Sequence, residues 1–186
     1  DEKGEPLEII GVWIDNSKAK IIEEQLNHLA NYDGLTSIAN RRYFTKLAKA
    51  ELSRSTRYNH PFTLLLLDID KFKSINDTYG HPTGDQVLIE LAEKCQNLLR
   101  NSDIFGRFGG EEFAIVLVET DAEKGMELAE RLRVKLSELS VLVDETKIQF
   151  TVSIGLTSKN DQKGTLDTII SRADNALYKA KESGRN

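Results

Sequence analysis

The sequence has little that could stabilise a fold apart from the packing of its core. Its 186 residues include a single cysteine, Cys95, so no disulfide can form within the chain and a reducing compartment fits. No apolar run reaches the roughly 18 residues that cross a bilayer. The opening residues, DEKGEP, do not resemble a signal peptide. A chain of this length can still bury a sizeable core without disulfides or a structural metal.

An excess of positive charge is also missing. The chain has 25 Lys and Arg against 30 Asp and Glu, which gives a net charge of -5. Binding to nucleic acid regardless of its sequence needs a basic surface, so a nucleic acid polymer is not an expected partner. A small anionic ligand held by a few local Lys and Arg is compatible with this balance. We expect this part of the protein in the cytoplasm, within a parent protein that is either free or membrane-associated.

Strands alternate with helices along the sequence, a pattern typical of a sheet with helices packed on it. The stretch FTLLLLDID is short and nearly all apolar, which predicts a central strand buried on both faces. Two strands at 103–108 and 112–118 follow each other closely and predict an antiparallel hairpin. Further helices are expected over about 40–58, 85–99, 122–139 and 166–182, and further strands over 5–14 and within 141–156.

Ahead of these elements, Ala19, Ile22, Leu26 and Leu29 follow 3-4-3 spacing with charged residues between them. One narrow apolar seam of this kind is typical of a two-helix coiled coil. It lasts barely two heptads, and a helix that packs on its own domain would show the same pattern.

The hairpin carries the first acidic group. The stretch FGRFGGEEFAIVL places Gly109 and Gly110, which tolerate a tight turn, directly before Glu111 and Glu112. Carboxylates fixed at the edge of a rigid sheet are costly unless a cation compensates them. Solvated turn acids without a ligand are the plain alternative.

The second acidic group, Asp68 and Asp70, ends the buried strand. Side chains alternate along a strand, so these two point one way and Ile69 the other. If this strand lies beside the hairpin, Asp68 and the two glutamates converge in a small volume. Mg²⁺ is usually held by one or two carboxylates plus substrate phosphates. The pattern therefore indicates metal-assisted phosphoryl or nucleotidyl transfer.

Between the acidic groups, Gly80, Pro82 and Gly84 predict a loop. The backbone N–H groups that follow the buried strand, together with the ammonium groups of Lys71 and Lys73, could hold phosphates.

Two polar residues of the same stretch suit a guanine base. Asp85 can accept from guanine N1–H and the exocyclic amine, and Asn76 can pair with other polar atoms of the ring. Adenine has no such pair of donors, so this arrangement favours guanine. Taken alone, Asn76 suits a turn and Asp85 suits a helix N-cap.

Five motifs, DGLTSIANRR, LDIDKFKSINDTYGHPTGDQVL, RFGGEEFAIVL, TVSIG and DNALYKAKESGRN, together resemble the GGDEF family of diguanylate cyclases. The resemblance implies a catalytic domain over 33–186, with a linker helix over 16–32. Residues 1–15 resemble the end of a PAS-like sensor domain, although Asn16-Ser17 stands where that family usually has Ile-Thr. The implied fold is α/β (α+β). Its five-stranded, largely antiparallel sheet is surrounded by helices, as in adenylyl cyclases and polymerase palms, and a helix extends from its N-terminus.

The resemblance also implies a homodimeric enzyme that condenses two GTP into cyclic di-GMP, with Mg²⁺, or alternatively Mn²⁺, as the cofactor. An upstream sensor domain in the parent chain would control it. Metal binding is assigned to Asp68, the Ile69 carbonyl, Glu111 and Glu112, with Glu111 also the base for the 3′-hydroxyl. Substrate contacts are assigned to Phe72, Lys73, Asn76, Asp85, Lys181 and Arg185. Product inhibition is assigned to the RxxD pair Arg100 and Asp103, completed by Arg131.

Several alternatives stay open at this stage. Lys181 and Arg185 could simply balance the dipole of a helix C-terminus, and Arg100 and Asp103 could end a helix and form a turn. The chain could be an inactive GTP or cyclic di-GMP sensor, a cyclase that also uses ATP, or a dimerisation module. Ile38 and Ala39 replace the more usual Gly-Leu of the family, but no catalytic position is lost.

Overall fold

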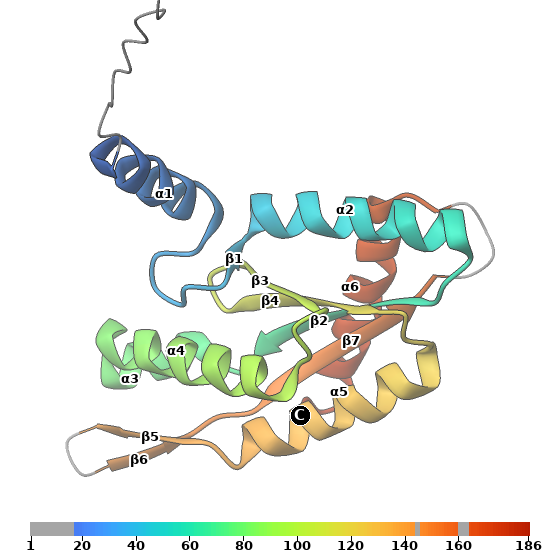
Figure 1. Ribbon diagram of the computed structural model, residues 1–186. Helices are drawn as coiled ribbons and strands as arrows, with labels where there is room; N and C mark the ends of the chain where they lie inside the picture. The colour runs from blue at the N-terminus through green and yellow to red at the C-terminus, as the bar shows by residue number, and fades with distance from the viewer. Residues whose placement is uncertain (1–16, 144–145, 160–163) are drawn as a thin grey trace, which may run out of the picture. The chain divides into compact units, whose positions relative to one another are not determined.

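The computed structural model describes residues 17–143, 146–159 and 164–186 (Figure 1). The chain divides into two units, Asp1–Ala30 and Asn31–Asn186. The strand predicted over 5–14 and the PAS-like stretch lie outside the described residues. Within the described ranges, no helix has the length and apolar character needed to span a membrane.

The second unit is built on a five-stranded sheet with the order β1-β3-β4-β2-β7. Only β1 runs parallel to its neighbour, β3, so the expected largely antiparallel sheet is confirmed. The strands of this sheet are β1 (Ala39–Asn40), β2 (Phe62–Ile69), β3 (Ile104–Gly109), β4 (Glu112–Val118) and β7 (Val152–Ser158), and a separate hairpin pairs β5 (Ser140–Val143) with β6 (Thr146–Gln149). The helices of this unit are α2 (Arg41–Tyr58), α3 (Phe72–Tyr79), α4 (His81–Leu98), α5 (Ala122–Ser137) and α6 (Leu166–Glu182).

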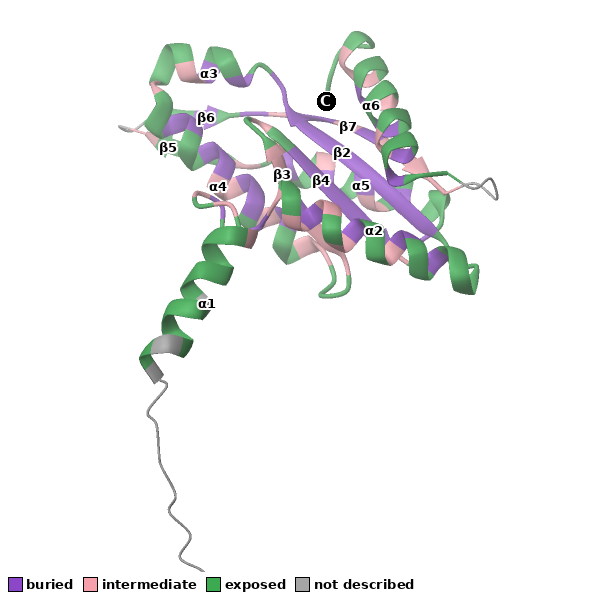
Figure 2. Ribbon diagram, turned by 90° about the horizontal axis from the view of Figure 1, so that it is seen from above, coloured by how far each residue is buried: buried purple, intermediate pink, exposed green. Residues whose placement is uncertain are grey.

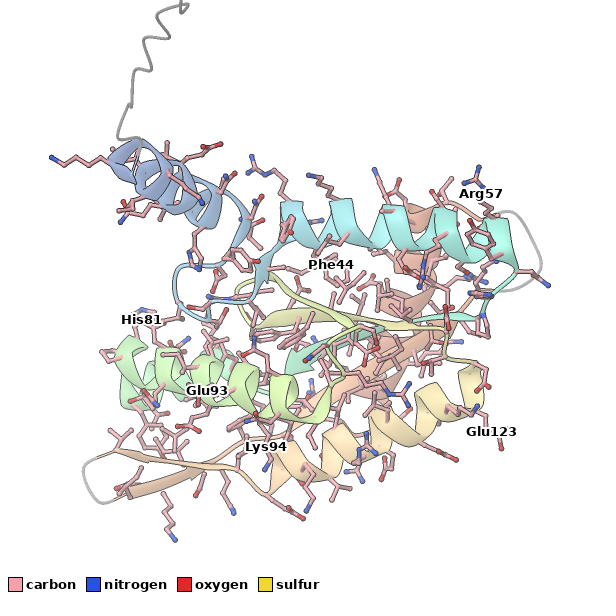
Figure 3. The ribbon with its side chains drawn as sticks, viewed as in Figure 1. Phe44, Arg57, His81, Glu93, Lys94 and Glu123 are labelled. Atoms are coloured by element: carbon pink, nitrogen blue, oxygen red, sulfur yellow. The ribbon has the colours of Figure 1, made fainter. Side chains whose placement is uncertain are left out.

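The central strand β2 is buried along its whole length, as predicted (Figure 2). Its alternating side chains enter two apolar clusters because neighbouring residues of a strand face opposite sides of the sheet. Leu65 and Leu67 pack with residues of α3, α4 and α5, whereas Leu64 and Leu66 pack with residues of α2 and α6. Phe44 of α2, which is fully buried, points toward the sheet in Figure 3. Helices therefore cover both faces of the sheet.

The loop predicted around Gly80, Pro82 and Gly84 is wrong. Pro82 and Gly84 lie within α4, and Gly80 alone separates α3 from α4. Proline is tolerated in the first turn of a helix because the N–H group it lacks has no partner there. Gly84 is buried against α3, so its missing side chain serves the packing of two helices rather than a turn.

The other helices and strands predicted within the described residues agree with the structure to within a few residues, whereas α3 and β1 were not predicted. Asn40 caps α2, where its side chain accepts from the Tyr43 N–H at 3.0 Å. The cysteine of α4, Cys95, is fully buried, and burial raises the pKa of its thiol to about 12. This thiol is therefore an inert part of the core.

The linker helix α1 spans Ser17–Asn31. Three residues of its seam are exposed, with exposed fractions of 56% for Ile22, 61% for Leu26 and 74% for Leu29.

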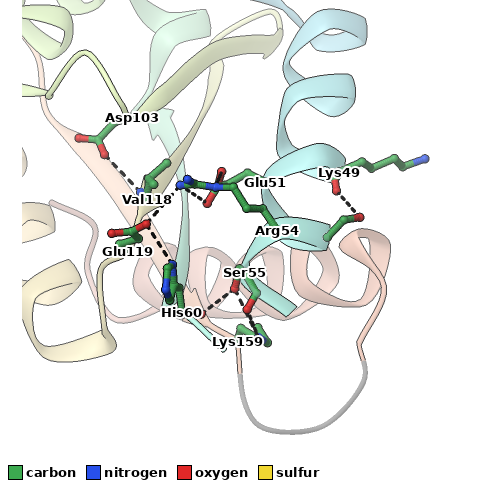
Figure 4. A network of polar contacts seen from close by, with 10 residues as sticks. Lys49, Glu51, Arg54, Ser55, His60, Asp103, Val118, Glu119 and Lys159 are labelled. Atoms are coloured by element: carbon green, nitrogen blue, oxygen red, sulfur yellow. Dashed lines mark hydrogen bonds and ion pairs between the residues drawn. The ribbon is translucent and has the colours of Figure 1, made fainter. Parts of the chain in front are cut away.

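The β2–β4 pair is tied to α2 at the end where Phe62 lies opposite Val118. Glu119, just beyond β4, lies 3.4 Å from the Arg54 guanidinium and 3.0 Å from Nδ1 of His60 (Figure 4). Ser55 donates to the His60 carbonyl at 2.7 Å, and Lys159 donates to the Ser55 carbonyl at 3.1 Å. These contacts fix the end of the sheet that lies away from Asp68.

At the other end, Arg107 joins the start of the domain to the double-glycine turn. Its guanidinium donates twice to the Gly110 carbonyl, at 3.0 and 2.8 Å, and once to Oδ1 of Asp33, at 3.0 Å. Asp33 also accepts from the N–H and the hydroxyl of Thr36 at 2.9 and 2.7 Å. Burial acts to raise the pKa of Asp33, but the bonds from Thr36 and Arg107 together outweigh it and hold that pKa below its usual range.

We therefore expect Asp33→Asn to destabilise the folded protein at pH 7 by about 1–2 kcal/mol, a common value for a hydrogen bond to a charged group. Because the folded-state pKa is lowered, the contribution of Asp33 is complete above the ordinary carboxyl pKa of about 3.9 and is lost as the pH falls through the lowered value. Denaturant unfolding between pH 7 and pH 2.5 measures the difference. The exposed Glu93 (Figure 3) supplies the control, Glu93→Gln, and a difference that persists at pH 2.5 would contradict the assignment.

Candidate functional site

The two acidic groups meet, as predicted, because β2 lies directly beside β4. Asp68 is opposite Glu112 in the register, and the Ile69 N–H lies 3.4 Å from the Glu111 carbonyl oxygen. The Ile69 side chain is buried in the core, so only its backbone can face a ligand. The end of the buried strand and the double-glycine turn therefore form one edge of the sheet.

Asp68 carries a buried charge at this edge. The residue is only 7% exposed, and its Oδ2 lies 2.7 Å from Nζ of Lys181 on α6. Burial is the largest influence on the Asp68 pKa and raises it; Lys181 acts to lower it, and the nearby Glu111 and Asp70 raise it further. The net effect is a raised pKa, so Asp68 is a carboxylate that is short of positive charge.

The carboxylates of this edge do not form a metal site by themselves. In the described ranges, no three His, Cys, Asp or Glu side chains lie close enough to hold a metal ion by themselves. Glu112 is exposed, whereas Glu111 is half-buried and close enough to raise the Asp68 pKa. Two carboxylates and a backbone carbonyl still suit Mg²⁺, which completes its coordination with phosphates and water. The donor set therefore fits a metal that arrives with a phosphorylated ligand.

The segment after Asp70 turns sharply into α3. Lys71 has a positive φ of 56°, and its carbonyl accepts from the N–H groups of Ser74 and Ile75 at 2.8 and 3.3 Å. The first N–H groups of a helix have no partner within the helix, which makes this end suited to an anion. The Phe72 side chain is buried, so its predicted contact with phosphate would come from its backbone, whereas Lys73 is exposed.

The predicted base-binding residues lie at the junction of α3 and α4. Asn76 is on α3 and Asp85 is on α4, directly after Gly84. A Cβ atom at Gly84 would overlap Oδ1 of Asn76 and press on the Phe72 ring, so the two helices meet at this point. Oδ1 of Asn76 is buried and has no hydrogen-bond partner in the structure. A buried acceptor without a donor is costly, which points to a ligand that supplies one. Asp85 is exposed within α4 and is not an N-cap.

The two basic residues near the end of α6 face different places. Lys181 pairs with Asp68, whereas Arg185 lines a cavity of about 470 Å³ together with Lys71 and Ser74. The pairing with Asp68 goes beyond a simple balancing of the helix dipole.

The RxxD pair forms a turn before β3. The Asp103 carboxylate accepts from the Arg100 N–H at 3.0 Å. It also accepts from the Val118 N–H at 3.3 Å (Figure 4). The Arg100 side chain is exposed and lines a cavity of about 390 Å³ together with Tyr43. Arg131 is exposed on α5. Asp103 thus has the local turn role that the sequence left open, while the product-inhibition role of these residues stays a prediction.

Three residues of this edge have structural roles that the sequence analysis did not predict. Arg107 holds the double-glycine turn, Gly84 makes room for Asn76, and Asp70 binds chain segments far from it in sequence. The sequence offered a signal for Asp70, whose spacing from Asp68 places both on one side of the strand, but it offered none for its partners.

Comparisons with known proteins show the family of this chain. Residues 30–186 match the family described as "Diguanylate cyclase, GGDEF domain". The chain belongs to the GGDEF family. The diguanylate cyclase DgcM of Escherichia coli K12 is 37% identical over 187 residues, covering 97% of this chain and 45% of that protein. The chain thus spans about half the length of the curated relatives it matches.

Solved structures of the GGDEF family share the fold. The coiled coil and GGDEF domain of DgcB from Caulobacter crescentus, in complex with c-di-GMP, has a TM-score of 0.85 and 31% identity, covering 91% of this chain and 90% of that one. The active GGEEF domain of a diguanylate cyclase from Vibrio cholerae has a TM-score of 0.74 and 37% identity, covering 78% of this chain and 92% of that one. These likenesses confirm the fold class expected from the sequence.

The ion pair between Asp68 and Lys181 leads to a test in the absence of any ligand. Lys181→Met keeps an apolar stem but leaves Asp68 without its cation, so we expect a loss of about 1–2 kcal/mol of stability at pH 7. Removing the cation raises the Asp68 pKa further, so the loss shrinks as the pH falls through that raised value and the carboxyl group becomes neutral. Denaturant unfolding at pH 7 and pH 4.5 measures both effects. The exposed Lys179→Met on the same helix is the control, and equal losses in the two variants would contradict the pairing.

Proposed function

We propose that this chain carries the catalytic domain of a diguanylate cyclase, which condenses two GTP into cyclic di-GMP and releases two pyrophosphates. The observation that carries this proposal is the buried Asp68, paired with Lys181 and placed beside the double-glycine turn, in a member of the GGDEF family. Family membership alone would also suit a domain that has lost its activity. Here Asp68, Glu111 and Lys181 are all present and share one edge of the sheet.

Guanine is the base that the α3–α4 junction suits. The buried Oδ1 of Asn76 needs a donor, and the exocyclic amine and N1–H of guanine are two adjacent donors. The exposed carboxylate of Asp85, on the neighbouring helix, can accept the other. Adenine would leave one of these acceptors unpaired, which disfavours ATP.

The triphosphate would lie along the start of α3, held by backbone N–H groups and by the side chains of Lys73, Lys181 and Arg185. Asp68, the Ile69 carbonyl, Glu111 and Glu112 would hold Mg²⁺ or Mn²⁺, which neutralises phosphate charge and lowers the cost of forming an alkoxide. Lys181, whose side chain is partly exposed, would pass from Asp68 to the phosphates when the metal takes its place beside that carboxylate.

The reaction needs two copies of this site. One chain carries one set of these residues and thus holds one GTP, whereas the product contains two nucleotides. Each 3′-oxygen would attack the α-phosphorus of the opposite GTP, each bond between the α-phosphorus and the bridging oxygen would break, and pyrophosphate would leave. Glu111 would accept the 3′-hydroxyl proton. A two-fold homodimer presents the two nucleotides in opposed orientation, and the exposed seam of Ile22 and Leu26 on α1 is suited to such a partner.

Product inhibition is part of the same proposal. Arg100 is exposed beside a cavity of about 390 Å³, and a guanidinium there could bind a cyclic di-GMP phosphate with two parallel hydrogen bonds. Asp103 keeps acceptor capacity beyond its two backbone bonds, because a carboxylate has about four acceptor positions. Arg131 would complete this site. An upstream sensor domain in the parent protein would act through α1.

The test is incubation of the chain with Mg²⁺ and either GTP or ATP, with the product identified by its mass. We expect cyclic di-GMP from GTP alone, at a rate per chain that falls on dilution and falls at least 10-fold in Ile22→Glu/Leu26→Glu. Glu111→Gln should lower the rate at least 100-fold, the common scale of general base catalysis. Arg100→Ala should keep its rate and lose inhibition by added product. Binding of GTP without any turnover would favour the inactive sensor instead.

Gly84 provides a separate test of the base-binding site. Gly84→Ala displaces Asn76, so we expect GTP to bind at least 10-fold more weakly, while overpacking lowers stability by about 1–3 kcal/mol. Titration with GTP and with ITP, which lacks the exocyclic amine, measures the effect, and the preference for GTP over ITP should shrink. Gly34→Ala is the matched control, because nothing lies within 4 Å of the added atom. An unchanged preference in Gly84→Ala would remove Asn76 from the base-binding site.

A further inference from the structure

Asp70 is a buried carboxylate to which neither the family resemblance nor the proposed mechanism gives a role. The residue is 6% exposed and lies just beyond the end of β2. Its Oδ2 accepts from the Thr151 hydroxyl at 2.6 Å, and its Oδ1 accepts from the Ser153 hydroxyl at 2.7 Å. Oδ2 also accepts from the backbone N–H of Asn186 at 3.2 Å. The carboxylate therefore joins three parts of the chain that are distant in sequence.

The sheet fixes the position of Asp70 independently of its side chain. Its backbone N–H donates to the Thr151 carbonyl at 2.9 Å, which continues the pairing of β2 with β7. Ser153 is 1% exposed and lies opposite Asp68 in that register. Two of the three donors to Asp70, Thr151 and Ser153, thus lie at the start of β7. The third, the Asn186 N–H, belongs to the segment after α6, so Asp70 connects this segment to the sheet.

Arg185 lies between two anchors on that segment. Its own N–H donates to the Ala180 carbonyl of α6 at 3.1 Å, and the next N–H along the chain is the one bound by Asp70. Gly184 turns the chain with a φ of 121°, and Arg185 itself has a positive φ of 68°. Such a backbone conformation costs a residue with a side chain about 1–2 kcal/mol. A bond to a buried carboxylate can offset that cost, which keeps Arg185 in this conformation.

Asp70 also sets the opposite wall of the cavity that Arg185 lines. The next residue, Lys71, has a φ of 56° and begins α3, and Lys71, Ser74 and Arg185 together line this cavity of about 470 Å³. Asp70 thus directly precedes the end of α3 that is suited to an anion, and its carboxylate holds the backbone next to the arginine that lines the same cavity.

We propose that Asp70 is a positioning residue, which holds Arg185 against the start of α3 so that both contact the outer phosphates of the bound nucleotide. The inference rests on the proposed function for the identity of that nucleotide. Asp70 acts through the Asn186 N–H and does not itself contact substrate. Its loss should therefore weaken contacts to the β- and γ-phosphates and leave contacts to the base unchanged.

The experiment compares GTP with GMP, which lacks those two phosphates, for the wild-type chain and for Asp70→Ala. We expect the dissociation constant for GTP to rise at least 10-fold and that for GMP to rise less than 3-fold. In an Arg185→Ala background, adding Asp70→Ala should change GTP binding less than 2-fold, because the two residues act through one contact. Asp77→Asn, an exposed carboxylate on α3, is the matched control and should bind both nucleotides as the wild-type chain does.

Hydrogen exchange without nucleotide supplies a readout that does not depend on the proposed function. In Asp70→Ala the N–H groups of residues 183–186 should exchange at least 10-fold faster, with those of β2 and β7 unchanged. If Asp70→Ala does not fold, Asp70→Asn, which keeps the size of the side chain, gives both comparisons with smaller effects. Equal losses of GTP and GMP binding, additive effects with Arg185→Ala, or unchanged exchange at 183–186 would each overturn the proposal. A wild-type chain that binds no GTP would defeat the proposed function, while the exchange data would still decide whether Asp70 anchors the segment.

Discussion

A carboxylate at the end of an otherwise apolar, fully buried strand is the constraint on which this site depends. Asp68 follows four consecutive leucines on β2, where the surroundings disfavour its charge and raise its pKa. The chain relieves this by placing Lys181 of α6, which packs on the same face of the sheet, within 2.7 Å. An apolar strand therefore fixes where the charge lies, and the last helix supplies its partner. The same arrangement is suited to cations and, with the start of α3, to the phosphates that would accompany them.

Hydrogen bonds between segments that are distant in sequence hold this edge of the sheet in place. Arg107 links the Gly110 carbonyl to Asp33, so the turn that carries Glu111 is held by the start of the domain. Asp70 links β2 and β7 to the segment after α6. At the far end of the sheet, Glu119 contacts α2 and the entry to β2 instead. One end of the β2–β4 pair thus serves as scaffold, which leaves the other end to present charged groups in fixed positions.

Local pattern was enough to predict most elements but not the junction of α3 and α4. The buried strand, the hairpin and the helix over 166–182 follow from apolar periodicity and turn residues, and the structure has them within a residue or two. Pro82 and Gly84 misled the prediction, because both are also tolerated in helices, Pro82 in a first turn and Gly84 at a close helix contact. The partners of Asp70 lie more than 80 residues away, at Thr151, Ser153 and Asn186, where no local pattern can reveal them.

The carboxylates of this edge differ in the ion-pair and hydrogen-bond partners that they have in the folded chain. Asp33 has an arginine, Asp68 has a lysine, and Asp70 has two hydroxyls and an N–H group. Of these three, only the Asp68 pair combines a raised carboxyl pKa with a cation on a flexible, partly exposed side chain, so it is the pair best suited to separate if a metal ion and phosphates bind. The bonds of Asp33 and Asp70 run to backbone groups or to side chains fixed by the sheet, and breaking them would move the turn or the end of the chain. The fold therefore separates carboxylates that hold the site in place from the one that is suited to react to a ligand.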